Sequence, residues 1–280
     1  MITSKTDLSP EARRQLHVFR SSLPIRVKLQ EILRSLGSTK GITCLDIGSD
    51  NAMLNYYIRK GGGDWHSVVA SKDIAESVRE MVKDNVKVQK GSKLPYDDKS
   101  FDVVAIINEL ERSESDVELI EECHRILKPD GKLVISTARI KSWSLIPLLQ
   151  GAMGVSPMKR GMVRPGYTEY QLFNILKDGF DVFNIRTYSR FCVELTDVLV
   201  QFIVRLIKLK HGEDSRKVTR FYSVARLFYG LASQFDMLLF FTKGHNMTAA
   251  AKRRLWKSRE APILTDGRSI TEVVLSKAAK

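Results

Sequence analysis

The sequence predicts an α/β fold in which helices cover both faces of a mostly parallel sheet. Short apolar runs recur along the chain, and segments with helical spacing of apolar residues separate them. Strands that alternate with helices favour a parallel sheet, because each strand needs a crossover before the next parallel one. The chain has 280 residues, of which 43% are hydrophobic, so it is long enough to bury a full core.

Two helices are predicted before the first strand. Ser9 and Pro10 are typical of a helix start, and a second helix is predicted over residues 23–36, ended by Gly37. Strands follow at the apolar runs 42–47, 65–70, 86–89, 101–107, 132–137 and 180–188. Helices between these strands are predicted at residues 53–58, 74–82, 116–127 and 168–177.

The pattern changes after Tyr188. Two long helices rich in apolar residues are predicted, at about residues 195–209 and 218–241. Polar and charged residues interrupt both, so neither offers the roughly 20 apolar residues of a membrane span. Such helices suit a pair at a membrane interface, a lid over an apolar substrate, or a cap packed on the sheet. Residues 245–253 take the position of a last strand, although few of them are β-branched.

The most informative segment is ITCLDIGSDNA, residues 42–52. An apolar run ends in an acid and a glycine, and a helical pattern follows directly. Gly48 allows a sharp turn and the close approach of a ligand, and the helix start behind it offers unpaired N–H groups. Taken alone, this segment fits an ordinary turn between a strand and a helix equally well.

Two further blocks follow in a set order. KLPYDDKSFDVVA, residues 93–105, is a turn that leads into a buried strand, and CHRILKPDGKLVIS, residues 123–136, is a helix end, a tight turn and another strand. Together the three blocks resemble the class I S-adenosylmethionine-dependent methyltransferases, in the methyltransferase type 11, quinone-methylase-like branch. The resemblance covers residues 38–189. It implies a Rossmann-like, seven-stranded, mostly parallel sheet, S-adenosyl-L-methionine as cofactor, and methyl transfer as activity.

This resemblance divides the chain into four parts. Residues 1–37 form an N-terminal helical cap, and residues 38–189 form the Rossmann-like domain that binds the cofactor. Residues 190–243 form an amphipathic helical pair, inserted or appended. Residues 244–280 hold the last strand and a basic tail.

The resemblance also implies site residues. The loop around the methionine moiety of the cofactor would be formed by Asp46, Gly48, Ser49 and Asn51. Asp73 would hold the ribose if the second strand extends that far, whereas Ser71 takes this position if the strand ends at Ala70. Asp73 also fits the start of a capping box with Glu76. Further candidates are Ser92 and Leu94 near the adenine, Asn108 beside the donor, and Glu109 and Tyr167 as catalytic residues.

Several of these positions depart from the family pattern. Asp50 and Ala52 replace glycines of the loop, and Ser92 replaces a common acid. Methyl transfer mainly requires that donor and acceptor are held in contact away from water, so the acceptor is hard to read from sequence. The departures leave open a second function, a catalytically degenerate protein that serves as a binding or scaffold subunit.

Charge and composition narrow the partners. A net charge of +13 favours an anionic partner, namely nucleic acid, an acidic membrane surface or an acidic substrate, although a basic surface also serves solubility. The aromatic residues fall mainly within apolar helical patterns, which favours a small hydrophobic or lipid-linked acceptor over RNA. RNA stays an alternative, since residues 48–52 also resemble one branch of tRNA adenine methyltransferases.

The N-terminal residues lack the apolar core of a signal peptide, so we expect a cytoplasmic protein with peripheral contact at the inner face of the membrane. The three cysteines are widely spaced, and we expect no metal site. The acceptor atom and the oligomeric state are not encoded in any of these patterns.

Overall fold

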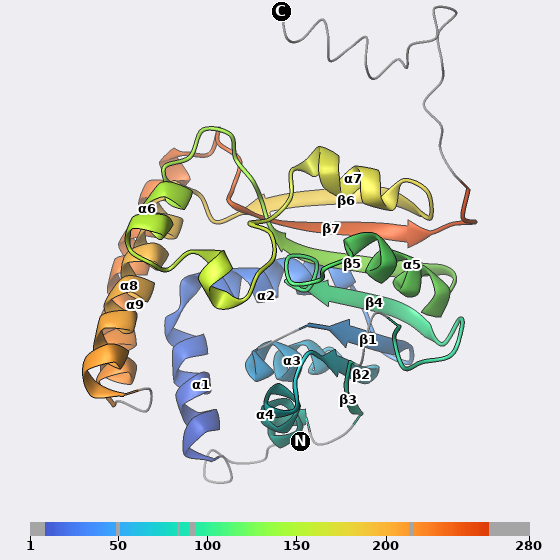
Figure 1. Ribbon diagram of the computed structural model, residues 1–280, viewed down its shortest axis with the longest axis horizontal. Coiled ribbons are helices and arrows are strands. Elements are labelled where there is room, and N and C mark those ends of the chain that lie inside the picture. Colours follow the sequence, from blue (N-terminus) through green and yellow to red (C-terminus); the bar gives the residue numbers. More distant parts are fainter. Residues whose placement is uncertain (1–8, 49–50, 83–84, 90–92, 213–215, 258–280) are drawn as a thin grey trace, which may run out of the picture.

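The computed structural model describes residues 9–48, 51–82, 85–89, 93–212 and 216–257. Seven strands form one sheet in the order β3-β2-β1-β4-β5-β7-β6, and β7 alone runs antiparallel to its neighbours (Figure 1). The strands are β1 Thr43–Ile47, β2 Asp64–Val69, β3 Val86–Val88, β4 Phe101–Ile107, β5 Leu127–Ala138, β6 Phe180–Tyr188 and β7 Asn246–Arg253. The predicted seven-stranded, mostly parallel α/β sheet is confirmed.

Helices cover both faces of this sheet. Their bounds are α1 Pro10–Ser21, α2 Leu23–Leu36, α3 Ala52–Arg59, α4 Lys72–Val82, α5 Asp116–Ile126, α6 Ile146–Ala152, the 3-10 helix η2 Pro157–Arg160, α7 Glu169–Leu176, α8 Phe191–His211 and α9 Arg216–Leu238. Ser9 caps α1 by accepting a hydrogen bond from the Ala12 N–H at 3.1 Å, and α2 ends at Gly37 with φ +71°. Both helix boundaries agree with the sequence pattern.

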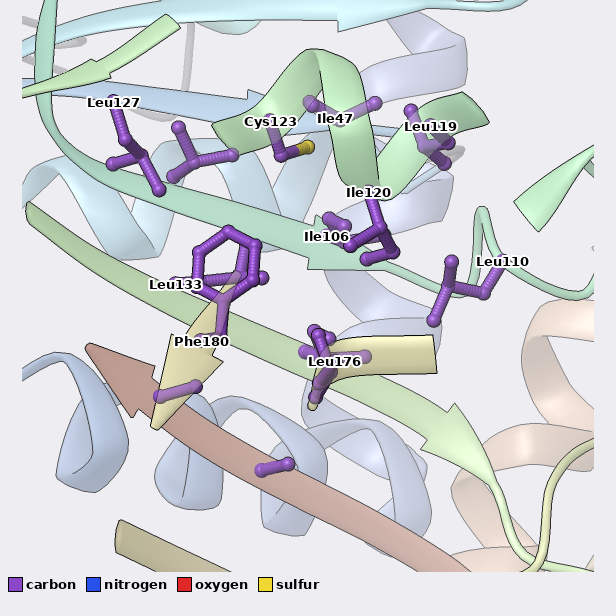
Figure 2. Close-up of a cluster of buried hydrophobic side chains, with 14 of the residues drawn as sticks. Ile47, Ile106, Leu110, Leu119, Ile120, Cys123, Leu127, Leu133, Leu176 and Phe180 are labelled. Carbon is purple, nitrogen blue, oxygen red and sulfur yellow. The ribbon is translucent and has the colours of Figure 1, made fainter. Parts of the chain in front are cut away.

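Two hydrophobic clusters fill the space between the sheet and its helices. Leu45 and Ile47 point to the face covered by α5 and α7, where Figure 2 shows Ile47 among the buried side chains of that cluster. Cys44 and Asp46 alternate with them and therefore point to the face covered by α2, α3 and α4. The alternation places the carboxylate of Asp46 inside the protein.

The strand β7 owes its position to its small side chains. Ala249, Ala250 and Ala251 are almost fully buried between β5 and β6. Helix α2 lies against β5, β6 and β7, so short side chains let it approach the sheet closely. Burial between two strands explains why a segment of weak intrinsic strand preference forms a central strand.

Helices α8 and α9 pack against each other beyond the carboxyl ends of β4 and β5, and α1 lies beside α9 (Figure 1). Among the helices that the structure describes, none combines the length and hydropathy needed to cross a bilayer. The pair therefore stands outside the sheet, where it borders the carboxyl-terminal edge.

Candidate functional site

The strand order has its reversal point between β1 and β4. From β1 the chain builds outward to β2 and β3, and it then returns to β4 on the other side of β1. In open α/β sheets the crevice beyond the carboxyl ends of the strands at such a point is where ligands bind. Gly48 follows β1 and Asn108 follows β4, so both lie at this edge.

Gly48 has φ +81°, a conformation that side chains of L residues rarely adopt. A Cβ atom at this position would lie 2.3 Å from the Cβ of Glu109, which is itself buried. The turn after β1 and the loop after β4 are therefore in direct contact. Only glycine allows both the backbone angle and this close approach.

Asp46 lies beneath this turn in a buried polar cluster. Its carboxylate accepts hydrogen bonds from Arg59 at 2.9 Å, from Ser67 at 2.8 Å and from the side chain of Asn55. Burial raises the pKa of Asp46, and the Arg59 guanidinium opposes that effect. All three partners come from α3 and β2, so Asp46 ties these elements to β1 and orders the turn from below.

The start of α3 completes the loop at the end of β1. Asn51 caps this helix by accepting a hydrogen bond from the Met53 N–H at 3.0 Å. The N-terminal end of α3, which is positively polarised, therefore follows the turn at Gly48 within a few residues of the chain. Ser49, which the resemblance also assigns to the loop, lies outside the described residues.

Strand β2 stops short of Asp73, the residue expected to hold the ribose if the strand extended that far. Strand β2 ends at Val69, and the hydroxyl of Ser71 accepts from the Ile74 N–H at 3.3 Å at the start of α4. Ser71 is thus the residue that caps α4, so the capping box proposed from Asp73 is wrong. Asp73 instead lies exposed in the first turn of α4. Its carboxylate is the acid nearest in sequence to the end of β2.

The adenine side is described only in part, because Ser92 lies outside the described residues. Leu94 is buried within the α5-side cluster. Its N–H donates to Glu122 at 2.8 Å, and its carbonyl accepts from Arg125 at 3.2 Å. These bonds fix the segment before β4 to helix α5.

Asn108 connects the donor side to a neighbouring cavity. Its backbone has φ +55°, and its side-chain oxygen accepts from the Lys28 ammonium of α2 at 3.2 Å. Both residues line a cavity of about 1320 Å³ that extends to α6 and α8. The wall is mixed, with apolar side chains such as Ile25 and Ile146 and a few convergent polar groups. A space of this size accommodates a small organic ligand.

Glu194, on the first turn of α8, lines this cavity and was missed by the sequence analysis. Its side chain is buried and accepts from the Asn246 amide at 2.6 Å. Burial raises the pKa of Glu194 to about 8, the negative charge of Asp197 adds to the rise, and Lys28 opposes it. A carboxyl group that changes its charge near neutral pH can accept or donate a proton there. The sequence feature that could have identified Glu194 was its place on the polar face of the predicted helix.

Tyr167 lies away from the cavity wall. Its hydroxyl donates to Asp116 at 2.8 Å or to the Leu110 carbonyl at 3.0 Å, and it accepts from Arg164 at 2.8 Å. Burial raises the pKa of the Tyr167 hydroxyl above its ordinary value. The side chain joins the loop before α7 to the loop after β4.

Comparison with known proteins agrees with this geometry. Residues 45–135, which run from β1 through most of β5, match the family model described as Methyltransferase domain. The sheet order and the turn at Gly48 match the expectation from the three sequence blocks. Residues 45–135 therefore hold a methyltransferase domain of the class I, S-adenosylmethionine-dependent type. The cofactor of this methyltransferase family is S-adenosylmethionine.

Similar curated proteins are ubiquinone biosynthesis O-methyltransferases from several strains of Coxiella burnetii. The strain Dugway 5J108-111 protein is 28% identical over 123 residues, which are 41% of this chain and 50% of that protein. The chain thus spans about half the length of the curated relatives it matches. The similarity therefore covers part of each protein rather than the whole.

Similar solved structures include a SAM-dependent methyltransferase from Thermotoga maritima, with 13% identity, 85% of this chain and 91% of that chain covered, and a TM-score of 0.53. The cyclase SpnF is similar to the same degree, with 15% identity, 83% and 82% covered, and a TM-score of 0.53. At these identities the likeness shows the fold alone. A cyclase on the same fold illustrates that activity has to be argued from the site.

Proposed function

We propose that this methyltransferase-family protein transfers a methyl group from S-adenosylmethionine to a small, hydrophobic or lipid-linked acceptor held in the 1320 Å³ cavity. The observation that carries the proposal is the position of that cavity. It reaches Asn108, which follows β4 beside the turn at Gly48, so a donor at the strand reversal point and an acceptor in the cavity would be neighbours.

The described residues fit the methionine end of the donor better than its ribose end. Gly48, Asn51 and the start of α3 offer a close backbone approach and N–H groups for the methionine moiety. Asn108 and Glu109 would border the donor, and Leu94 its adenine end. Although β2 ends at Val69, Asp73 is our candidate for the ribose rather than Ser71, because Ser71 already caps α4 and Asp73 is the acid nearest in sequence to the strand end. When bound, S-adenosylmethionine supplies an electrophilic methyl group, and the protein's task is to orient the acceptor and exclude water.

The proton of a hydroxyl acceptor needs a base on the cavity side, and we assign this role to Glu194. Its carboxyl group is buried in the wall, and Asn246 fixes its orientation. Glu109, which the sequence analysis named as a catalytic candidate, packs against Gly48. We therefore assign it to the donor side of the site and not to the acceptor cavity. We assign Tyr167 to positioning the loops, because its hydroxyl already has three partners.

An apolar acceptor is supported by the wall and by the surroundings of the cavity. Apolar residues of α2, α6 and the following loop contribute to the wall, and the neighbouring helices α8 and α9 carry further exposed apolar residues on their outer sides. The relatives named as ubiquinone biosynthesis O-methyltransferases support an acceptor of the same general kind. We further propose that the protein acts in the cytoplasm, at the inner face of the membrane.

Calorimetry with S-adenosylhomocysteine tests the donor site. Asp73→Asn should weaken binding about tenfold if its carboxylate holds the ribose, because it loses a charged acceptor for two hydroxyls. Glu76→Gln is the matched control, since Glu76 is also exposed on α4. Full binding by both variants would remove Asp73 from the site. No binding by the unaltered protein at millimolar ligand would refute the proposed activity and favour the degenerate scaffold.

A second measurement separates chemistry from binding. Glu194→Gln keeps the shape of the side chain and its hydrogen bond from Asn246, but it cannot take up a proton. We expect it to bind S-adenosylhomocysteine normally and to lose methyl transfer to a phenolic test acceptor. Normal transfer by this variant would exclude Glu194 as the base.

A further inference from the structure

Helix α9 carries a stripe of exposed apolar side chains over residues 224–238. They recur at helical spacing and comprise Val224, Leu227, Phe228, Leu231, Phe235 and Leu238. Leu227 is 71% exposed and Leu231 61%, which is unusual for residues of this size. Such a stripe on a helix of a folded protein indicates a surface that another apolar phase covers.

Helix α8 has a similar stripe, formed by Leu199, Ile203 and Leu206. On the same helix, Asp197, Gln201 and Arg205 line the cavity, so the stripe lies on the other side of α8. Helix α6 packs on α8 and carries a further exposed apolar residue, Leu148, and Trp143 before α6 is 93% exposed. Helix α8 therefore separates the cavity from this apolar surface by about one helix diameter, ~10–12 Å.

The exposed charges on the described residues of α8 and α9 are all positive. The three acids of these helices, Glu194, Asp197 and Asp236, turn inward and accept hydrogen bonds from Asn246, from Tyr229 at 2.6 Å, and from the Cys192 N–H at 2.8 Å. The exposed basic residues are Arg205, Lys208, Lys210, Arg216, Lys217, Arg220 and Arg226. An apolar surface with a one-signed positive charge matches an anionic lipid surface.

We infer that the exposed apolar residues of α8 and α9, together with the basic residues Lys210, Arg216, Lys217 and Arg220 on the same sides of these helices, dock the protein on an anionic lipid bilayer. These residues are called here the α8–α9 surface. A second copy of the chain fits less well, because a two-fold contact through this surface would set like charges against each other. The inference rests on the proposed function only for its purpose, which is to bring the cavity close to an apolar acceptor dissolved in the bilayer. The docking itself requires no donor.

Vesicle sedimentation with the full chain tests the docking. The protein should bind vesicles of phosphatidylcholine with phosphatidylglycerol, and it should bind phosphatidylcholine alone at least tenfold more weakly. The variant Leu227→Glu with Leu231→Glu should lower binding more than tenfold. The variant Lys210→Glu with Arg220→Glu should lower it about tenfold and reduce its dependence on salt. Val117→Glu, on an exposed apolar residue of α5, is the control and should bind normally.

Three results would overturn the inference. They are the absence of vesicle binding by the unaltered protein, equal binding by the Leu227→Glu, Leu231→Glu variant, and a dimer in light scattering that this variant dissociates without any vesicle binding. Calorimetry with S-adenosylhomocysteine on the same samples keeps the two proposals apart. Vesicle binding without donor binding would retain the docking and remove the methyltransferase activity, whereas the reverse result would remove the docking alone.

Discussion

The carboxyl group of Glu194 makes the stability of the protein depend on pH in a direction opposite to that of most acids. Its pKa is about 8 in the folded protein against an ordinary value of 4.5. The folded state therefore holds a proton that the unfolded state has already released, so the free energy of unfolding falls as pH rises between these values. At ~1.36 kcal/mol for each pH unit, the loss from this group amounts to about 5 kcal/mol.

Glu194→Gln removes this dependence, because a glutamine stays neutral at every pH and still accepts from Asn246. Urea unfolding between about pH 5 and pH 9 should show nearly equal stability of variant and parent at the acid end. The variant should then gain on the parent as pH rises, by up to about 5 kcal/mol. The groups that face Glu194 in the parent are Asp197 on α8, Lys28 on α2 and Asp236 on α9.

Glu121→Gln is the matched control for this measurement. Glu121 is an exposed acid on α5, so its substitution should leave the pH profile unchanged. A stability difference between parent and Glu194→Gln that is the same at all pH values would refute the reasoning, because it would mean that Glu194 ionises as it does in water. A variant less stable than the parent at the alkaline end would refute the assigned sign.

Two further substitutions test the carboxyl end of β1. Gly48→Ala places a Cβ 2.3 Å from the Cβ of Glu109, at a residue whose φ is positive. It should therefore destabilise the protein by at least about 1–3 kcal/mol in thermal or urea unfolding. The control is Gly151→Ala, whose added Cβ meets open space and should change stability by less than about 1 kcal/mol. Arg59→Met leaves the buried carboxylate of Asp46 without its charge partner and should cost about 3–5 kcal/mol near neutral pH. The double variant with Asp46→Asn should recover part of that loss, and additive losses would contradict the pairing.

The fold was predictable because its elements are set by local patterns. The apolar runs placed β4 and β6 at their observed bounds, and Ser9 and Gly37 placed helix ends, since capping chemistry acts within a few residues. Strand β7 was predictable only from its position in the family fold. Its alanines carry little strand preference of their own, and the neighbouring strands and α2 determine its conformation.

The candidate site was predictable at Gly48 and Asn51, where the turn follows directly from the residue types. Glu194 was not, because polar residues on one face of a helix ordinarily face water. Whether that face borders bulk solvent or a cavity depends on α2 and α6, which are distant in sequence. The same limit applied to Asp46, whose partner Arg59 becomes visible only once α3 packs on the sheet.

Ala250 shows how a small residue outside the cavity lining lets a helix of the cavity wall approach the sheet. It pairs with Val134 of β5 and lies on the face of the sheet that α2 covers. Helix α2 carries Lys28, whose ammonium reaches Asn108 at 3.2 Å. The small side chain at Ala250 leaves room for α2 to lie close to the sheet, and α2 in turn holds Lys28 against Asn108 in the cavity wall.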